Sequence, residues 1–417
     1  MTAPTIDHPH RSAHPTWPAG DYTQIPFWLY TDPELFEREM ARIFCGRSWS
    51  YVALEAELPE PGSYKTTRVG NRSIIVCRNR NGELRAFANR CAHRGVKFCR
   101  EALGKTNRFT CPYHQWTYDL NGDLKGVPFL RGVKGQGGMP EDFDPAQHGL
   151  QTLKVTSHHG VVFASFAHDV EDFVSYLGTA NQYYFERVFD GRELKILGYS
   201  RQLIPGNWKL MFENIKDPYH ASLLHVFLVT FGLFRADQES QVRMDDTGRH
   251  GLLISRRGQQ QATEHTKDIA NLRADFKLQD PRLLDPVKEF KDTATVVMQT
   301  IWPNLIVQQQ SNTIAMRQIQ PRDANSFELS WTFFGFADDD EAMTLRRLRQ
   351  ANLMSVSGFV SSDDSEVIKL AQDGLSPYPD AQALLEMGGR DTHDEEHMVT
   401  ETAIRAFYKH YRAIMEI

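Results

Sequence analysis

Long apolar runs, an excess of basic charge and a large set of cysteines are all missing from this sequence. No stretch of about eighteen consecutive apolar residues occurs, and no apolar segment follows a basic one at the start, so we expect neither a membrane span nor a secretory signal. A net charge of −6 argues against proteins that coat nucleic acid or anionic membranes, because those partners attract basic surfaces. We therefore expect a cytoplasmic protein with no nucleic-acid or membrane partner.

Five cysteines are too few, and odd in number, for a disulfide framework in a chain of 417 residues. A reducing compartment and a metal-binding role suit them better. The sequence also lacks a Gly-x-Gly-x-x-Gly dinucleotide fingerprint and the cysteine run of a plant-type ferredoxin, so those functions should reside in other proteins. The length, with 41% hydrophobic residues, predicts two domains with ordinary cores.

The pattern along the chain predicts four segments. Residues 1–20 are rich in proline and histidine without periodicity, which indicates a flexible tail. Residues 21–48 contain one amphipathic helix, which should pack on the catalytic domain. Short alternating runs separated by Asn-Gly turns predict an all-β module over residues 49–166. Over residues 167–417, helical stretches alternate with strand-like runs, which suggests an antiparallel sheet with helices packed on one face.

Within the last segment, the charged, Gln-rich stretch 258–290 indicates a surface excursion. The expected helices lie near residues 170–187, 208–222, 339–354 and 396–415. The expected strands lie near residues 193–204, 250–257, 293–301, 304–319 and 325–335.

Two cysteines and two histidines of the β module form a first metal-binding pattern. A Cys-x-His motif and a Cys-x-x-His motif each supply one thiolate and one imidazole, and this is the ligand set of a Rieske [2Fe–2S] centre. The alternative is a structural zinc site of the same ligand types, but zinc modules more often pair cysteine with cysteine and histidine with histidine. Ligand order and spacing therefore favour the Rieske cluster. Its expected ligands are Cys91, His93, Cys111 and His114.

A second pattern lies in the stretch 207–225, which contains Asp217, His220 and His225. On a helix, Asp217 and His220 would share a face, whereas His225 needs a helix end or a distortion to reach the same point. Two neutral imidazoles and one carboxylate make the facial triad that leaves positions on Fe(II) open for dioxygen. A histidine pair is a weak signal alone, but a one-electron carrier in the same chain needs a site that consumes electrons.

The carboxylate of that triad has two candidates in the sequence, Asp363 and Asp364. Asp217 has two interpretations as well: a role beside the metal site, or a surface carboxylate on a helix. The sequence pattern is the same for both.

Together these motifs resemble the large (α) subunits of Rieske non-haem iron aromatic-ring-hydroxylating oxygenases over nearly the whole chain. The resemblance implies an α+β fold, with an all-β Rieske [2Fe–2S] domain and a helix-grip (START-like) catalytic domain built on an antiparallel sheet. It also implies one mononuclear Fe(II) held by His220, His225 and, of the aspartate pair, Asp364. Asp217 would then bridge His114 of one protomer to His220 of the next, in a ring of three α subunits, α3 or α3β3 with small β subunits.

Within that family, the stretches 132–140, 213–225 and 386–389 resemble the oxygenases of aromatic acids, such as salicylate 5-hydroxylase and the anthranilate and terephthalate dioxygenases. This resemblance implies hydroxylation of an aromatic carboxylic acid with O₂ and with electrons from NADH, delivered by a reductase and a ferredoxin. Salicylate, giving gentisate, is the first expectation. Anthranilate and terephthalate dioxygenation are the alternatives.

Arg317 is the expected partner of the substrate carboxylate, which its planar guanidinium group can bind through two hydrogen bonds. The alternative is an internal salt bridge with a protein carboxylate. Met398 lies about where the terephthalate branch has a second arginine, so one substrate carboxylate is expected rather than two. Further pocket residues are expected from the family pattern and from their distance along the chain to the ligands: Met316, Asn214, Met298, Gln310, Val360, Met211 and Phe227.

Two rival functions remain open from the sequence. One is a Rieske electron-transfer protein without oxygenase activity, which would carry two irons per chain where the oxygenase carries three. The other is a zinc-containing protein that binds aromatic acids without turnover, which would lack the visible spectrum of a [2Fe–2S] centre.

Overall fold

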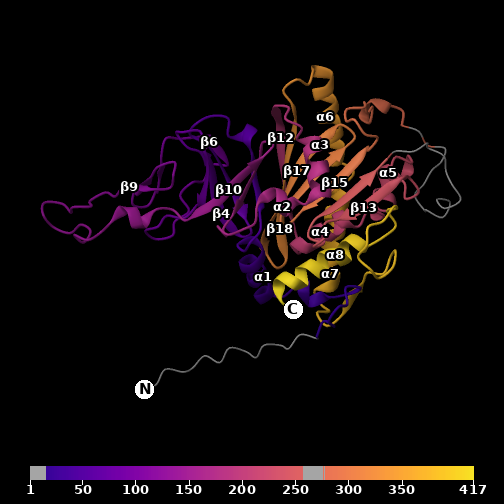
Figure 1. The fold of residues 1–417 in the computed structure, drawn as a ribbon, viewed down its shortest axis with the longest axis horizontal. Coiled ribbons are helices and arrows are strands. Elements are labelled where there is room, and N and C mark those ends of the chain that lie inside the picture. Colours follow the sequence, from indigo (N-terminus) through magenta and orange to yellow (C-terminus); the bar gives the residue numbers. More distant parts are fainter. Residues whose placement is uncertain (1–15, 257–275, 277) are drawn as a thin grey trace.

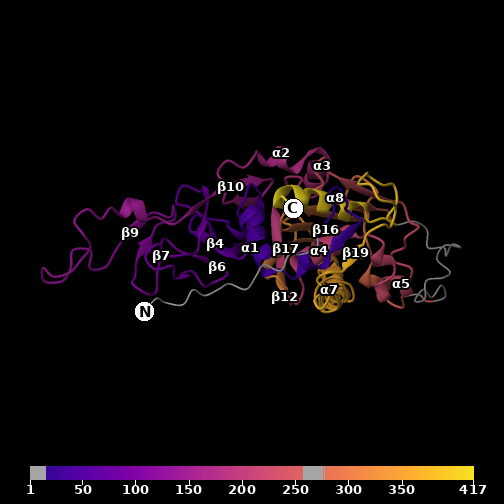
Figure 2. The same ribbon diagram turned by 90° about the horizontal axis from the view of Figure 1, so that it is seen from below.

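The structure, a computed structural model, describes residues 16–256, 276 and 278–417. The chain forms two lobes that lie side by side, a β-rich lobe and a larger lobe of sheet and helices (Figure 1). Figure 2 shows the same two lobes from below, with α7 (Ser361–Leu375) and α8 (Thr402–Met415) in the larger lobe. Nowhere in these residues is there a helix long and apolar enough to cross a membrane.

The β-rich lobe is built on a seven-stranded antiparallel sheet in the order β2-β11-β10-β5-β4-β3-β6. A three-stranded sheet, β7-β8-β9, extends it. The two Asn-Gly turns occur as expected, with φ of +82° at Gly82 and +89° at Gly122, where glycine carries no steric penalty. The strands are β2 (Ser50–Leu54), β3 (Ser63–Val69), β4 (Arg72–Arg78), β5 (Leu84–Ala88), β6 (Leu103–Lys105), β7 (Phe109–Thr110), β8 (Thr117–Tyr118), β9 (Leu124–Gly126), β10 (Thr152–His158) and β11 (Val161–Ser165).

The larger lobe is built on a second seven-stranded sheet, in the order β12-β18-β17-β16-β15-β14-β13, with every neighbouring pair antiparallel. The expected α+β class, an all-β domain followed by a catalytic domain with an antiparallel sheet, is confirmed. The strands are β12 (Leu194–Ile204), β13 (Ser240–Met244), β14 (Gly251–Ser255), β15 (Val296–Ile301), β16 (Leu305–Gln310), β17 (Thr313–Asp323) and β18 (Ser326–Phe336).

Helices surround this sheet, and α4 crosses it in contact with β14, β15 and β17. The helices are α2 (Phe173–Leu177), α3 (Thr179–Val188), α4 (Trp208–Lys216), α5 (Val226–Thr230), α6 (Glu341–Met354), α7 (Ser361–Leu375) and α8 (Thr402–Met415). A short strand pair, β1 (Gln24–Pro26) with β19 (Gln382–Leu384), ties the start of the described chain to the segment after α7.

The amphipathic helix expected before the β module is α1 (Pro33–Glu39), continued by a π-helical turn at Met40–Phe44. It is joined to α4 by an ion pair of 2.6 Å between Glu39 and Lys209, whose side chains are 1% and 0% exposed. Trp208 and Tyr411 also donate hydrogen bonds to the Glu39 carboxylate. The helix therefore packs on the larger lobe although it precedes the smaller one in the sequence.

Two of the expected segments lie partly outside the described residues, and one of them needs correction. Residues 1–15 lie outside the described part, but Trp17 is 5% exposed and packs edge-on against Tyr408, so the flexible tail does not extend to residue 20. Of the expected surface excursion 258–290, residues 258–275 and 277 also lie outside it. Its described last part lies largely at the surface, as expected, and is anchored by Leu284 and Phe290, which are buried.

Among the elements, the expected strand 304–319 is two strands, β16 and β17. They are separated by a tight turn in which Ser311 has a φ of +54°. Neither β13 nor α7 was expected.

Candidate active site

The two Cys-His loops of the β-rich lobe have the same backbone form. In the first, the Gly95 N–H donates to the Cys91 carbonyl at 2.9 Å, and in the second the Gln115 N–H donates to the Cys111 carbonyl at 3.0 Å. Gly95 and Gln115 both adopt left-handed backbone, with φ of +72° and +55°. Each motif therefore lies on a tight turn that closes four residues after its cysteine.

These turns bring the four expected cluster ligands to one end of the lobe. The rings of His93 and His114 lie 4.7 Å apart, and His93 stacks on Trp116 with an angle of 9° between the planes. Cys91 and Cys111 are each 2% exposed, whereas His93 is exposed and His114 half-buried. The thiol side of the site is thus inside the lobe and the imidazole side faces outward.

The spacing of these donors tests the zinc alternative. A tetrahedral zinc ion with bonds of about 2.0–2.3 Å holds all its ligand atoms within about 4 Å of one another. In the described parts of the chain, two groups of three or more donors lie within 4.8 Å of one another, and neither contains Cys91, His93, Cys111 or His114. The four donors are therefore spread wider than one ion requires, and they fit two bridged irons.

A broken helix positions the two histidines of the larger lobe. The Asn207 side chain caps the start of α4, and the helix ends at Lys216 because Pro218 disfavours helical backbone at Asp217. His220 then opens a 3-10 turn, His220–Ser222, and His225 precedes α5. His225 was expected to need a helix end or a distortion to reach the same point as His220, and the end of α4 at Lys216 is such a helix end.

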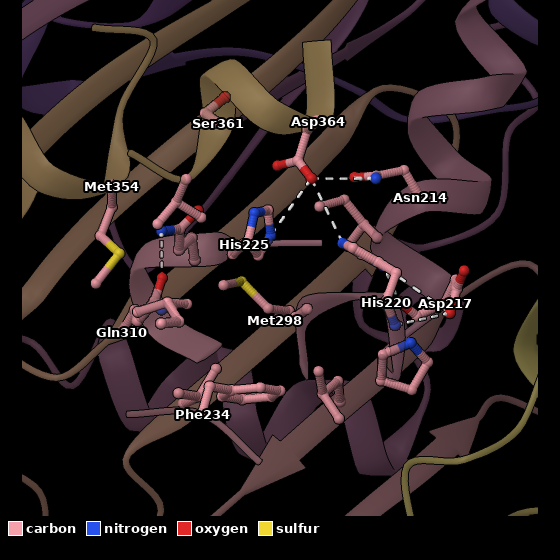
Figure 3. A pocket seen from close by; sticks show the side chains of 18 of the residues that line it. Asn214, Asp217, His220, His225, Phe234, Met298, Gln310, Met354, Ser361 and Asp364 are labelled. Atoms are coloured by element: carbon pink, nitrogen blue, oxygen red, sulfur yellow. Dashed lines mark hydrogen bonds and ion pairs between the residues drawn. The ribbon is translucent and has the colours of Figure 1, made fainter. Parts of the chain in front are cut away.

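Asp364 completes this group from the first turn of α7 (Figure 3). Its Oδ1 lies 3.4 Å from Nε2 of His220 and 3.5 Å from Nε2 of His225. All three donors lie within 4.8 Å of one another, and Asp364 is 4% exposed. Two imidazoles and one carboxylate converging on one point are the donor set of a facial-triad iron.

The opposite nitrogen of each imidazole also has a partner. Nδ1 of His225 lies 3.3 Å from Oδ2 of Asp363, and Nδ1 of His220 donates to the main-chain carbonyl of Asp217. Such partners fix the ring orientation and the tautomer that leaves Nε2 free for a metal. Of the two candidate aspartates, Asp364 therefore lies at the convergence point and Asp363 lies behind His225.

Charge in the site favours the ionised form of Asp364. Burial alone would raise the pKa of its carboxyl, but the hydrogen bond from His220 and the charges of His225, His220 and Arg317 hold that pKa below its usual value. For Asp217, burial dominates and raises the pKa to about 6, although His220 acts in the opposite direction.

A cavity of about 560 Å³, its mouth included, opens beside these three donors. Its wall is mainly apolar, with a few polar side chains from β16, β17 and α4. The apolar lining residues include Ala221, Leu228, Phe234, Leu253, Val296, Met298, Trp331, Met354 and Val360, and the polar ones include Asn214, Gln308, Gln310, Arg317 and Ser361.

Five of the eight expected pocket residues thus line the cavity, namely Arg317, Asn214, Met298, Gln310 and Val360. Met211 packs in the main core and Phe227 against neighbouring apolar clusters. Met316 does not line the cavity, because neighbouring strand residues face opposite sides and Met316 packs in the main core instead. Met398 is fully buried in an apolar cluster that also contains Phe234 and Leu253.

The sequence alone did not indicate Gln308, Trp331, Ser361 or Phe234. Gln308 could have been found, since it lies two residues from Gln310 and strand alternation places both on one face. The other three come from separate elements that only the fold brings together.

Comparison with known proteins identifies the family. Residues 48–136 match the model of the Rieske [2Fe-2S] domain, and residues 176–417 match that of the ring hydroxylating alpha subunit (catalytic domain). The chain is 50% identical to the large oxygenase component of salicylate 5-hydroxylase from Ralstonia sp, with 100% of both chains covered. It is 40% identical to the anthranilate 1,2-dioxygenase large subunit of Burkholderia cepacia, with 96% of this chain and 95% of that one covered.

The fold itself is that of naphthalene 1,2-dioxygenase from Rhodococcus sp. in its complex with indole, at a TM-score of 0.78 and 24% identity over 94% of each chain. The matched domains are those that hold a Rieske [2Fe–2S] cluster and a mononuclear iron, and the donors described above fit both. The chain therefore belongs to the ring-hydroxylating alpha subunits and is a Rieske non-haem iron oxygenase.

Proposed function

We propose that this chain is the large oxygenase subunit of a system that hydroxylates an aromatic acid with one carboxylate, with salicylate as the substrate and gentisate as the product. The observation that carries the proposal is Arg317, a buried cation in the wall of the iron cavity. The chain's relatives that are named for salicylate and anthranilate support the same substrate class, because each of these aromatic acids has one carboxylate.

Arg317 has no carboxylate within 4.0 Å in the described residues, which argues against the alternative of an internal salt bridge. Its Nη1 donates to Gln308 at 3.3 Å, its Nη2 contacts the Met211 sulfur at 3.5 Å, and its Nε has no hydrogen-bond partner. The guanidinium lies 4.4 Å from the centre of the Trp331 ring. Burial lowers the pKa of Arg317 to about 10, so the group is still charged at neutral pH.

A buried cation without an ion-pair partner in contact is costly, and a bound carboxylate would supply one. Planar carboxylates pair with guanidinium through two parallel hydrogen bonds, and the unpartnered Nε is one of the donors for such a pair. Of the described lining residues, Arg317 is the one arginine or lysine. A monocarboxylate therefore fits this wall better than a dicarboxylate.

The cluster ligands in this proposal are Cys91, His93, Cys111 and His114, and the iron ligands are His220, His225 and Asp364. When bound, the metals supply dioxygen activation and the electrons that it requires, one at a time. The chain's residues do the rest: Arg317 orients the acid, the apolar wall excludes water from the ring, and Asp363 holds His225 in place. In the overall reaction one oxygen atom enters a ring C–H bond and the other leaves as water, with two electrons from NADH.

The electrons are proposed to arrive from NADH through a reductase and a ferredoxin, in the cytoplasm, and to cross between neighbouring α subunits of a trimer, α3 or α3β3. Two observations support a route through Asp217. The two metal sites lie in separate lobes of one chain (Figure 1), and Asp217 adjoins His220 on the side away from Asp364, with 23% of its side chain exposed. A carboxylate at that position is available to a histidine of another protomer.

The test is a parallel assay of the purified oxygenase with NADH, a reductase and a ferredoxin, and with salicylate, anthranilate, benzoate and terephthalate as substrates. Products are identified by mass after incubation under ¹⁸O₂. We expect gentisate from salicylate, with one ¹⁸O atom in the ring hydroxyl that is added. Turnover of terephthalate alone would contradict the assignment of Arg317 as the single carboxylate anchor. Turnover of anthranilate alone would mean that anthranilate, and not salicylate, is the substrate.

A further inference from the structure

A second group of metal-binding side chains lies outside the sites described above, at the junction of the two lobes. His158 ends β10, His159 follows it in the turn to β11, and Glu186 lies on α3. Nε2 of His158 is 3.0 Å from Oε1 of Glu186, and Nε2 of His159 is 3.8 Å from the same oxygen. One ligand atom from each residue lies within 4.8 Å of the others, which among the described residues is otherwise true only of His220, His225 and Asp364.

The backbone of the turn explains why two adjacent histidines reach one carboxylate. Consecutive side chains of a strand point to opposite faces, so an extended His158-His159 pair would diverge. His159 instead has a φ of +49° and Gly160 a φ of +82°, the backbone of a two-residue hairpin turn in which Asn-Gly is the favoured pair. A histidine is held in left-handed backbone here, and its ring comes to 4.5 Å from that of His158.

The surroundings of the group hold its donors in place and leave one side open. The His158 ring packs against Phe173 and Phe185 at 5.7 and 5.8 Å. Gln182, one helical turn before Glu186, donates to its Oε1 at 2.8 Å. The side chains of His159 and Glu186 are 37% and 34% exposed, so solvent reaches the group.

The carboxylate is also in the correct charge state for a metal ligand. The hydrogen bond from Gln182, together with the hydrogen bond and charge of His158, holds the pKa of Glu186 below its usual value. A metal competes with protons for the nitrogens of the two imidazoles, so zinc binding should weaken as the pH falls.

We propose that His158, His159 and Glu186 bind a divalent transition-metal ion, zinc in preference, with water as the fourth ligand. Two imidazole nitrogens and one carboxylate oxygen are ligands that zinc accepts in tetrahedral sites with one open position. Calcium and magnesium would not be bound, because they require a set of oxygen ligands. Because the histidines belong to the β-rich lobe and Glu186 to α3, the ion would join the last hairpin of one lobe to a helix of the other.

The test uses the iron-loaded oxygenase, dialysed against buffered zinc, with the zinc and the iron per chain measured on the same samples. The loss of iron per chain gives the amount of zinc that has replaced iron in the other sites, and this amount is subtracted from the total zinc. Three variants are compared with the wild type: His159→Asn, which keeps a residue favoured in that turn, Glu186→Gln, and as a matched control His168→Asn. His168 is an exposed histidine between β11 and α2, outside the group.

We expect one additional zinc per chain in the wild type and in His168→Asn. Losing a residue that only supports a metal ligand weakens metal binding roughly 10–100-fold. His159→Asn and Glu186→Gln each remove a ligand itself, so we expect zinc binding to weaken by at least that factor in both variants. Zinc should also raise the thermal midpoint of the wild type more than that of His159→Asn, since binding to the folded state stabilises it. Equal zinc uptake by all four proteins, or uptake fully matched by lost iron, would overturn the proposal. The visible spectrum of the cluster checks that each variant is folded.

Discussion

Arg317 is the residue whose environment says most about the substrate. Its guanidinium lies in the cavity wall with contacts to Gln308, Met211 and the Trp331 face, and none of these neutralises its charge. A salt bridge inside the protein would have explained a buried arginine at this place without any ligand. Its absence in the described residues is what makes a negatively charged substrate the better explanation.

For Arg317→Gln we expect kcat/KM for salicylate to fall at least about 30-fold, because removing one partner of a desolvated charge pair costs about 2 kcal/mol or more. Salicylamide, which has no charge, should be converted by the variant and the wild type at similar rates. Arg322→Gln is the matched control, since Arg322 lies on the same strand but pairs with Glu328 at the surface. Equal losses with the charged and the neutral substrate would show that Arg317 acts only through the fold.

Glu213 is a second residue with an unusual environment, half-buried on α4 next to Tyr30 and Tyr408. Tyr408 donates a hydrogen bond to its carboxylate, and the two tyrosine hydroxyls lie 2.8 Å apart. Burial raises the pKa of Glu213 from 4.5 to about 7, although the tyrosines and Lys209 act in the opposite direction. Between these two pH values the folded protein therefore retains a proton that the unfolded chain has released.

The sign of the resulting pH dependence follows from that proton. The contribution of Glu213 to stability is fully present below its unfolded pKa, falls as the pH rises towards 7, and is lost above it. Compared with Glu213→Gln, the wild type should lose on the order of 3 kcal/mol of unfolding free energy between about pH 4.5 and 7. Thermal midpoints of both proteins across this range test the prediction. Parallel midpoint curves would mean that Glu213 titrates normally.

At the scale of elements, the attachment of α1 to the larger lobe depends on the buried pair of Glu39 and Lys209. Lys209→Met should destabilise the protein by about 3–5 kcal/mol, because it leaves the Glu39 carboxylate buried with hydrogen bonds from neutral donors alone. The double variant Glu39→Leu/Lys209→Met should recover most of this loss, since a buried ion pair replaced by apolar groups is often neutral. Denaturant unfolding of the three proteins measures both effects. A double variant as unstable as the single one would mean that packing volume dominates.

The elements also show where sequence patterns succeed and fail. Alternation and β-branched runs predicted β12, β15 and β18 closely, because the pattern of each of these strands is local. The boundary between β16 and β17 was missed, because the turn at Ser311 carries no glycine or proline signal. Likewise α7 begins in a polar run of serines and aspartates that resembles a loop, although its first turn holds Asp364.

For the whole molecule, the proposed electron route between protomers can be tested with mixed oligomers. Cys111→Ser should prevent assembly of the cluster, and Asp364→Ala should prevent binding of the mononuclear iron. Each variant alone should be inactive. Oligomers that contain both should regain activity, because a cluster in one protomer can then supply the iron of its neighbour.

Two affinity tags on the coexpressed variants allow the mixed oligomers to be isolated, and product formation from salicylate is the measurement. The matched control repeats the experiment with Asp217→Ala added to the Cys111→Ser chain, which retains the mononuclear iron and should lose the regained activity. Mixed oligomers that carry both metals and stay inactive would contradict transfer between protomers. Full activity of the mixed oligomers with Asp217→Ala would show that the electrons do not pass through Asp217.

The sequence by itself determined the family, the two metal-binding motifs and the residue types in each, because ligand spacing in short loops is a local property. It also indicated the sheet of the catalytic domain, whose strands carry their own pattern. Only the tertiary structure decided that Asp364 rather than Asp363 meets both imidazoles, that Arg317 has no protein carboxylate and that Met316 faces the core. Each of these depends on contacts between elements far apart in the chain, and no pattern within one segment reports which distant side chain will lie opposite it.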